Sequence, residues 1–149
     1  MSGFFMKRFE VSTEIGSLFV TYQKQKKVLV CLSGAGLLPS YENFSLILEK
    51  LPPTIGYLTI DFPNTGRSPI RDQAGKNLDN LADAVYKVLE ELAISEYILC
   101  AHSLSGILAC KLLNKPIKCQ ALVALEPTTK KVMFADFSKN PYPEMEEQM

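Results

Sequence analysis

The feature that most constrains the fold is an alternation of apolar runs with segments of helical periodicity. The runs "VLVCLS" (28–33), "GYLTID" (56–61), "YILCAH" (97–102) and "CQALVALE" (119–126) have the unbroken apolar character of strands that are buried on both faces. Helical patterns separate them. Strands joined by helices in this order predict an α/β fold, a mostly parallel, doubly wound sheet with right-handed crossovers.

Three segments carry the helical periodicity. Asn77 is the expected N-cap of the clearest one, and Ser40 is the expected N-cap of another, which Pro52 and Pro53 end. The third follows the run at 97–102 and ends near Pro116. In the clearest segment the apolar side chains recur at three- and four-residue steps: Leu78, Leu81, Val85, Val88, Leu89 and Leu92.

The N-terminal segment has a different pattern. "RFEVSTEIGSLFVTYQ" alternates apolar and polar residues on both sides of Gly16, which predicts an antiparallel hairpin that turns near this glycine. After Pro127 the periodicity is lost. We therefore expect a core over residues 1–127, and the start of a lid or a disordered tail over residues 128–149.

Composition excludes several classes of function. Sixteen basic and sixteen acidic residues give no net charge, so nucleic-acid binding is not expected. One histidine and four cysteines without close spacing argue against a metal site, and no dinucleotide or phosphate-loop motif indicates a cofactor. Reduced, buried cysteines and the absence of a signal-peptide pattern favour a cytoplasmic protein, and no apolar tract is typical of a membrane span.

Ser103 is the leading candidate for chemistry. It follows an expected strand and precedes an expected helix, and in open α/β sheets ligands bind beyond the carboxyl ends of the strands. A tight turn there exposes the hydroxyl, and the helix N-terminus presents free N–H groups to the same place. Such a turn needs small neighbours, and Ala101, Ser105 and Gly106 are small.

The residues 101–105, "AHSLS", resemble the nucleophile elbow G-x-S-x-G of the α/β-hydrolases, with both glycines replaced. "VLVCLSGAG" resembles the strand and loop that form half of that family's oxyanion hole. "DFPNTGRS" is similar to its loop D-x-x-G-x-G-x-S, where Asn64 takes a glycine's place because asparagine tolerates positive φ. The resemblance implies that Ser103 is the nucleophile and that the N–H groups of Ala35 and Leu104 bind the oxyanion.

The same resemblance implies acyl transfer from an ester, thioester or amide, so the expected partner is a small-molecule substrate with a carbonyl centre. In the family the catalytic acid and histidine follow the serine in later strands, and residues 1–149 contain neither of those segments. His102 is expected to face away from the Ser103 hydroxyl and to pack beside the elbow, hydrogen-bonded to backbone. Glu126 is the candidate acid.

We therefore expect the N-terminal part of a longer hydrolase, inactive as this chain. An exposed edge at the last strand would leave self-association open. One alternative is a non-catalytic binding or interaction protein on the same fold. Another is a flavodoxin-like binding domain in which Ser103 only caps a helix.

Overall fold

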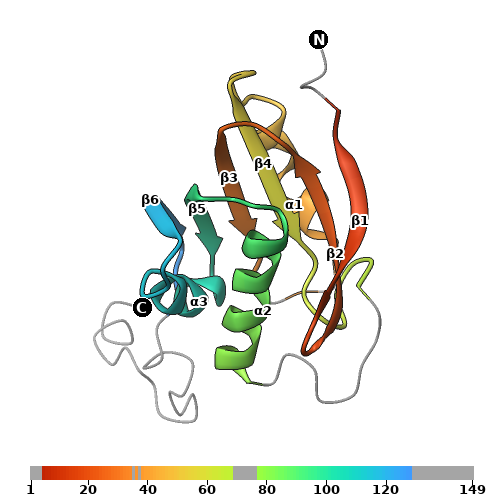
Figure 1. Ribbon diagram of the computed structural model, residues 1–149, viewed down its shortest axis with the longest axis vertical. Coiled ribbons are helices and arrows are strands. Elements are labelled where there is room, and N and C mark those ends of the chain that lie inside the picture. The colour runs from red at the N-terminus through yellow and green to blue at the C-terminus, as the bar shows by residue number, and fades with distance from the viewer. Residues whose placement is uncertain (1–4, 35, 37, 69–76, 129–149) are drawn as a thin grey trace, which may run out of the picture.

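The computed structural model describes residues 5–34, 36, 38–68 and 77–128, which form one six-stranded sheet with three helices (Figure 1). The order of the strands across the sheet is β1-β2-β4-β3-β5-β6. In chain order the elements are β1 (Lys7–Thr13), β2 (Gly16–Gln23), β3 (Lys27–Leu32), α1 (Ser40–Leu48), β4 (Ile55–Ile60), α2 (Leu78–Glu91), β5 (Glu96–His102), α3 (Ser105–Leu112) and β6 (Lys118–Leu125).

The sheet is mixed, as the sequence predicts. β1 and β2 form the antiparallel hairpin, and β2 also pairs antiparallel with β4. From β4 through β3 and β5 to β6 the strands run parallel. The predicted fold class is therefore confirmed. The pairing of Leu32 with Ala101 brings the carboxyl ends of β3 and β5 side by side, and the candidate site lies at these ends.

The helices cover both faces of the sheet, with α2 and α3 on one side and α1 on the other (Figure 1). Val85, Val88 and Leu89 of α2 are fully buried in the larger core. Phe44 and Leu48 of α1 pack into the smaller one. Each face of the sheet is thus closed by apolar side chains at helical spacing, which is the arrangement that the amphipathic segments require.

The two predicted N-caps have different outcomes. Asn77 does cap α2, and its side-chain oxygen accepts hydrogen bonds from the N–H groups of Asp79 and Asn80. The prediction for Ser40 is wrong, because Ser40 is the first residue inside α1 and Pro39 precedes it. The Ser40 N–H donates to Asp61 Oδ1 at 2.6 Å, so a carboxylate from another loop satisfies this N–H in place of a local cap.

The cysteines are less uniformly buried than expected. Cys31 and Cys100 lie in the core as register partners on β3 and β5, whereas Cys110 is exposed and Cys119 is half-buried. Cys110 lies on the outer face of α3, and Cys119 on the edge strand. A hydrogen bond with Cys100, together with burial, raises the pKa of Cys31 above its usual range, so this thiol stays protonated.

β6 also differs from the expectation of a strand buried on both faces. Among the described residues it pairs with β5 alone, and Leu122 and Val123 are 40% and 45% exposed. An edge strand with little cover on either face keeps its apolar side chains in contact with solvent. No helix among the described residues is long and apolar enough to cross a membrane.

Candidate active site

The parallel pairing of β3 with β5 sets the loop after β3 against the turn after β5. A Cβ atom built on Gly34 would lie 2.8 Å from Ser103 Cβ and 3.2 Å from His102 Nδ1. Only a residue without a side chain fits at this distance. Gly34 therefore allows the loop after β3 to approach the Ser103 backbone, an approach that an oxyanion-binding loop requires.

Ser103 is held in a strained conformation. Its φ is +52°, in the left-handed region, which costs a non-glycine residue about 1–3 kcal/mol. Three backbone hydrogen bonds fix the turn: the Ser103 N–H donates to the Leu125 carbonyl, and the Ser103 carbonyl accepts from the N–H groups of Gly106 and Thr128, each at 2.9 Å. The surrounding structure thus stabilises a sharp strand-to-helix turn at Ser103.

The structure describes one of the two expected oxyanion donors, Leu104, and not the other, Ala35. Leu104 is the N-cap of α3, so its N–H belongs to the first turn, where helices leave N–H groups without intrahelical acceptors and the dipole favours negative charge. Ala35 lies outside the described residues. Its role as the second donor stays a prediction, to which the position of Gly34 lends support.

Ser105 has a role that the sequence does not reveal. It takes the place of the second glycine of the elbow motif, it is fully buried, and its hydroxyl donates a hydrogen bond to the Ser33 carbonyl. This bond joins the start of α3 to the end of β3. The replacement of glycine by serine therefore adds a hydrogen bond between the turn after β5 and the loop after β3.

The contacts that Pro127 and Thr128 make with the site are also not predicted from the sequence. A Cβ atom on Gly106 would lie 2.9 Å from Pro127 Cβ, so the glycine allows the segment after β6 to pass close to α3. The Thr128 hydroxyl then lies 3.4 Å from Ser103 Oγ. No spacing rule points to this contact, because it depends on how the chain turns after β6.

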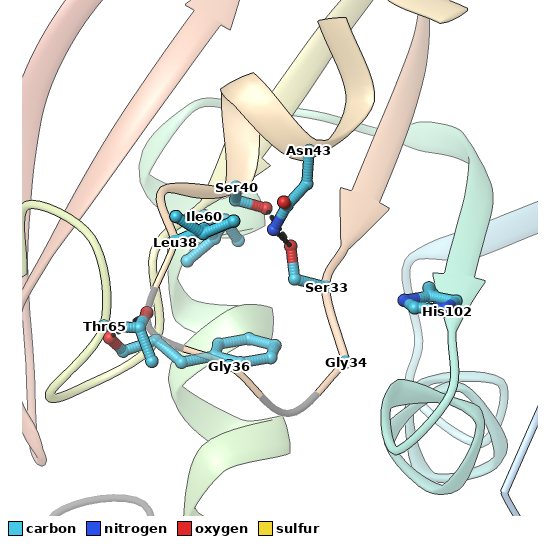
Figure 2. Close-up of a pocket in the computed structure, with 10 residues that line it drawn as sticks. Ser33, Gly34, Gly36, Leu38, Ser40, Asn43, Ile60, Thr65 and His102 are labelled. Carbon is cyan, nitrogen blue, oxygen red and sulfur yellow. Dashed lines mark hydrogen bonds between the residues drawn. The ribbon is translucent and has the colours of Figure 1, made fainter.

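A small cavity of about 230 Å³ opens beside the ends of β3 and β5 (Figure 2). On one wall the hydroxyls of Ser33 and Ser40 lie 2.9 Å apart, and Asn43 Nδ2 donates to Ser33 Oγ at 3.4 Å. His102 lines the opposite wall. The cavity thus offers polar groups for a ligand next to apolar side chains, of which Leu38, Ile60 and Phe62 are three.

The His102 ring lies beside the Ser103 turn, next to Gly34, but the expectation that it bonds to backbone is wrong. His102 is exposed, and its imidazole ring makes no hydrogen bond to another described residue. It is the last residue of β5, its register partner is Leu125 of β6, and its side chain lines the cavity. Ser103 is not among the described residues that line this cavity.

The loop after β4 supports the site. The Asp61 carboxylate accepts from the N–H groups of Ser40 and, at 2.8 Å, Arg67, and a Cβ atom on Gly66 would lie 2.3 Å from Asp61 Oδ2. Gly66 and Asn64 both have positive φ, at 49° and 63°, so the expected conformation of Asn64 is confirmed. The buried Asp61 therefore ties this loop to the start of α1.

Glu126, the candidate acid, directly follows β6. It is exposed, its φ is +45°, and its carboxylate makes no hydrogen bond within the described part of the chain. No group of three or more His, Cys, Asp or Glu side chains among the described residues is placed to hold a metal ion.

A sequence profile of the α/β hydrolase fold family matches residues 27–147. The chain is 30% identical over 112 residues to the Mycoplasma genitalium protein named "Putative esterase/lipase 2", across 70% of this chain and 39% of that protein. The crystal structure of Smu.1393c from Streptococcus mutans is 34% identical and superposes with a TM-score of 0.87 over 97% of this chain and 53% of that one.

A more distant structure has the same fold. The proline iminopeptidase-related protein TTHA1809 from Thermus thermophilus is 20% identical, with a TM-score of 0.73 over 83% of this chain and 45% of that one. In each of these matches the chain spans about half, or less, of the relative's length.

Proposed function

Because the chain belongs to the α/β hydrolase fold family, we propose that Ser103 is the nucleophile of a hydrolase that acts on an ester, thioester or amide. The observation that carries this proposal is the strained Ser103 turn, which three backbone hydrogen bonds hold next to Gly34. Backbone strain that the surrounding structure maintains is characteristic of functional sites. The esterase/lipase name of the Mycoplasma genitalium relative supports the same reaction class.

The proposed reaction has two stages. Ser103 Oγ attacks the carbonyl carbon while a base takes its proton, and the resulting oxyanion accepts hydrogen bonds from the N–H groups of Ala35 and Leu104. The alcohol, thiol or amine then leaves with a proton, and an acyl-enzyme remains. Water attacks the acyl group in the second stage, releases the acid and restores the serine.

The described site does not supply the base that would take the Ser103 proton, nor a carboxylate placed to orient such a base. The sequence has one histidine, His102, which is exposed on the cavity wall. We propose that the base and the acid correspond to the half of the hydrolase relatives that this chain does not span. Glu126 is the acid candidate within the chain itself. In this proposal residues 1–127 are the core, and the lid or tail expected over residues 128–149 lies, after Thr128, outside the described residues.

A chimera tests the proposal. In it this chain replaces the matching half of Smu.1393c, so that the rest of a hydrolase fold is present. We expect hydrolysis of p-nitrophenyl esters that the Ser103→Ala variant loses, with unchanged circular dichroism and thermal melting. Equal rates with and without the Ser103 hydroxyl would contradict the assignment of the nucleophile.

The second candidate function is non-catalytic binding through the cavity beside β3. The exposed position of the single histidine favours it, because a serine hydroxyl without a base is a poor nucleophile. A chimera that folds, melts cooperatively and hydrolyses no ester would support this function over the first.

A further inference from the structure

Two cysteines lie side by side on the central strands of the sheet, just before the candidate active site. Cys31 of β3 and Cys100 of β5 are register partners in a parallel pairing, and both belong to the smaller core on the α1 face. The Cys31 thiol donates a hydrogen bond to the Cys100 sulfur. The two sulfur atoms therefore face each other on the same side of the sheet.

The spacing of neighbouring strands is close to the spacing that a disulfide requires. Paired strands lie about 4.8 Å apart. Cysteines joined by a disulfide have Cα atoms about 4.4–6.8 Å apart and Cβ atoms about 3.8 Å apart. The bond can thus form while the strands stay paired, but it draws the two Cβ atoms together by about 1 Å. A disulfide under such strain is more easily reduced than an unstrained one, so this pair is suited to reversible oxidation.

Cys100 is the more reactive of the two thiols. Its side chain keeps 3% exposure, whereas Cys31 has 0%. The hydrogen bond from Cys31 lowers the pKa of Cys100, and the thiolate is the form of cysteine that attacks an oxidant. A small oxidant therefore reacts first at Cys100, with Cys31 in place to react next.

We propose that Cys31 and Cys100 are a redox-active pair that hydrogen peroxide converts to a disulfide. The Cys100 sulfur attacks one peroxide oxygen, the O–O bond breaks, and a sulfenic acid forms while the departing hydroxide takes the Cys100 proton and leaves as water. The Cys31 sulfur then attacks the Cys100 sulfur. The S–S bond forms, the S–O bond breaks, and a second water leaves with the Cys31 proton. The two thiols lose two electrons, which the peroxide gains, and a dithiol reverses the change by thiol–disulfide exchange.

The disulfide also affects the candidate active site, a consequence that rests on the proposed function. Gly34 and Ser103 each stand three residues after one of the cysteines. Their close approach depends on the spacing of β3 and β5, which the disulfide changes. A displacement of about 1 Å in a catalytic site can slow a reaction by about 100-fold. Oxidation of the pair therefore lowers the reactivity of the Ser103 hydroxyl.

Peptide mapping of the full chain tests the disulfide. In the double variant Cys110→Ser/Cys119→Ser, which keeps only the central pair, peroxide should link the tryptic peptides 28–50 and 88–111 within a chain that still migrates as a monomer. Dithiothreitol should reverse the link. Adding Cys31→Ala should abolish the link and leave a Cys100 sulfenic acid that dimedone traps, and circular dichroism verifies the fold. Free thiols after peroxide treatment, or a covalent dimer in place of the internal link, would overturn the proposal.

The effect on Ser103 is measured separately, in the chimera with Smu.1393c. We expect a fluorophosphonate to label Ser103 at least about tenfold more slowly after peroxide treatment, and dithiothreitol to restore the rate. Cys31→Ala is the matched control, because its labelling rate should not respond to peroxide. A disulfide that leaves the labelling rate unchanged would contradict the effect on the site. If the reduced chimera takes up no label while the full chain forms the disulfide, the proposed function fails and the redox-active pair stands.

Discussion

Gly34 and Ser103 lie so close together that a methyl group on Gly34 would stand 2.8 Å from Ser103 Cβ. β3 and β5 create this contact by pairing in parallel up to Leu32 and Ala101. The loop that carries one expected oxyanion donor therefore lies closer to the Ser103 turn than a residue with a side chain at position 34 would allow. The distance between the two loops is set by the lack of a side chain at one residue.

Gly34→Ala should destabilise the chain. The added methyl group meets Ser103 Cβ, which the backbone hydrogen bonds of the turn hold in place, and overpacking of this kind costs about 1–3 kcal/mol. Thermal and urea denaturation of the variant measure this cost. Unfolding parameters equal to those of the wild type would show that the two loops are not in contact.

Ser105→Gly supplies the second glycine of the G-x-S-x-G motif, yet we expect it to lower stability. The substitution removes the hydrogen bond from the buried Ser105 hydroxyl to the Ser33 carbonyl, at a cost of about 1 kcal/mol, and adds backbone freedom at the start of α3. Ser105→Ala should show the hydrogen-bond loss alone.

Ser45→Ala is the matched control for this pair of variants. The Ser45 hydroxyl also donates to a backbone carbonyl, that of Glu42, but in an exposed position on α1. Its removal should change the free energy of unfolding by less than about 0.5 kcal/mol. If Ser105→Ala were equally harmless, the bond to Ser33 would not stabilise the fold.

The Glu42–Arg67 ion pair predicts a small pH dependence of stability. Its two N–O contacts, at 2.7 and 3.2 Å, join α1 to the loop after β4, and the hydrogen bond from Arg67 lowers the pKa of Glu42 below its ordinary 4.5. A lowered pKa in the folded state means that the stabilisation is full above pH 4.5 and is lost as the pH falls through the lowered value.

Thermal melting as a function of pH checks this sign. Glu42→Gln should melt at a lower temperature than the wild type at neutral pH. The difference in the free energy of unfolding should be less than about 1 kcal/mol, because both side chains are partly exposed. The melting temperatures of the two proteins should become equal in acid. Glu49→Gln is the control, since Glu49 forms no ion pair with a described residue. A difference that grew in acid would mean that the assigned sign is wrong.

The isolated 149-residue chain should hydrolyse p-nitrophenyl esters no faster than its Ser103→Ala variant. The reason is that the described residues place no base at Ser103, since the single histidine is exposed on the cavity wall and makes no hydrogen bond to Ser103. Initial rates at matched protein concentrations decide the matter. A clear rate that depends on Ser103 would mean that the chain holds a base of another kind.

Much of the fold follows from the sequence because each apolar run and each helical stripe reports local burial. The parallel strands, the N-terminal hairpin and the Asn77 cap of α2 follow in this way. Where a residue far away in the sequence provides the hydrogen-bond partner, the local sequence pattern gives the wrong prediction. Serine is a common N-cap residue, but Ser40 lies inside α1 and its N–H donates a hydrogen bond to the carboxylate of Asp61, which follows β4.

In the candidate site, too, features set by the local sequence can be predicted and features set by distant contacts cannot. The position of Ser103 at a strand-to-helix turn is readable from the chain, and so is the positive φ of Asn64. The contact of Thr128 with Ser103 and the bond of Ser105 to Ser33 depend on side-chain directions in three dimensions. Sequence periodicity contains no information about these directions.

The most direct test of the central claim is the mass of the chimera with Smu.1393c after reaction with a fluorophosphonate, which transfers its phosphonyl group to an activated serine oxygen and releases fluoride. Peptide mapping should find one adduct, on Ser103, and Ser103→Ala should remain unlabelled. An adduct that persists in Ser103→Ala, or a folded chimera that takes up no phosphonyl group, would contradict the role of Ser103 as the nucleophile.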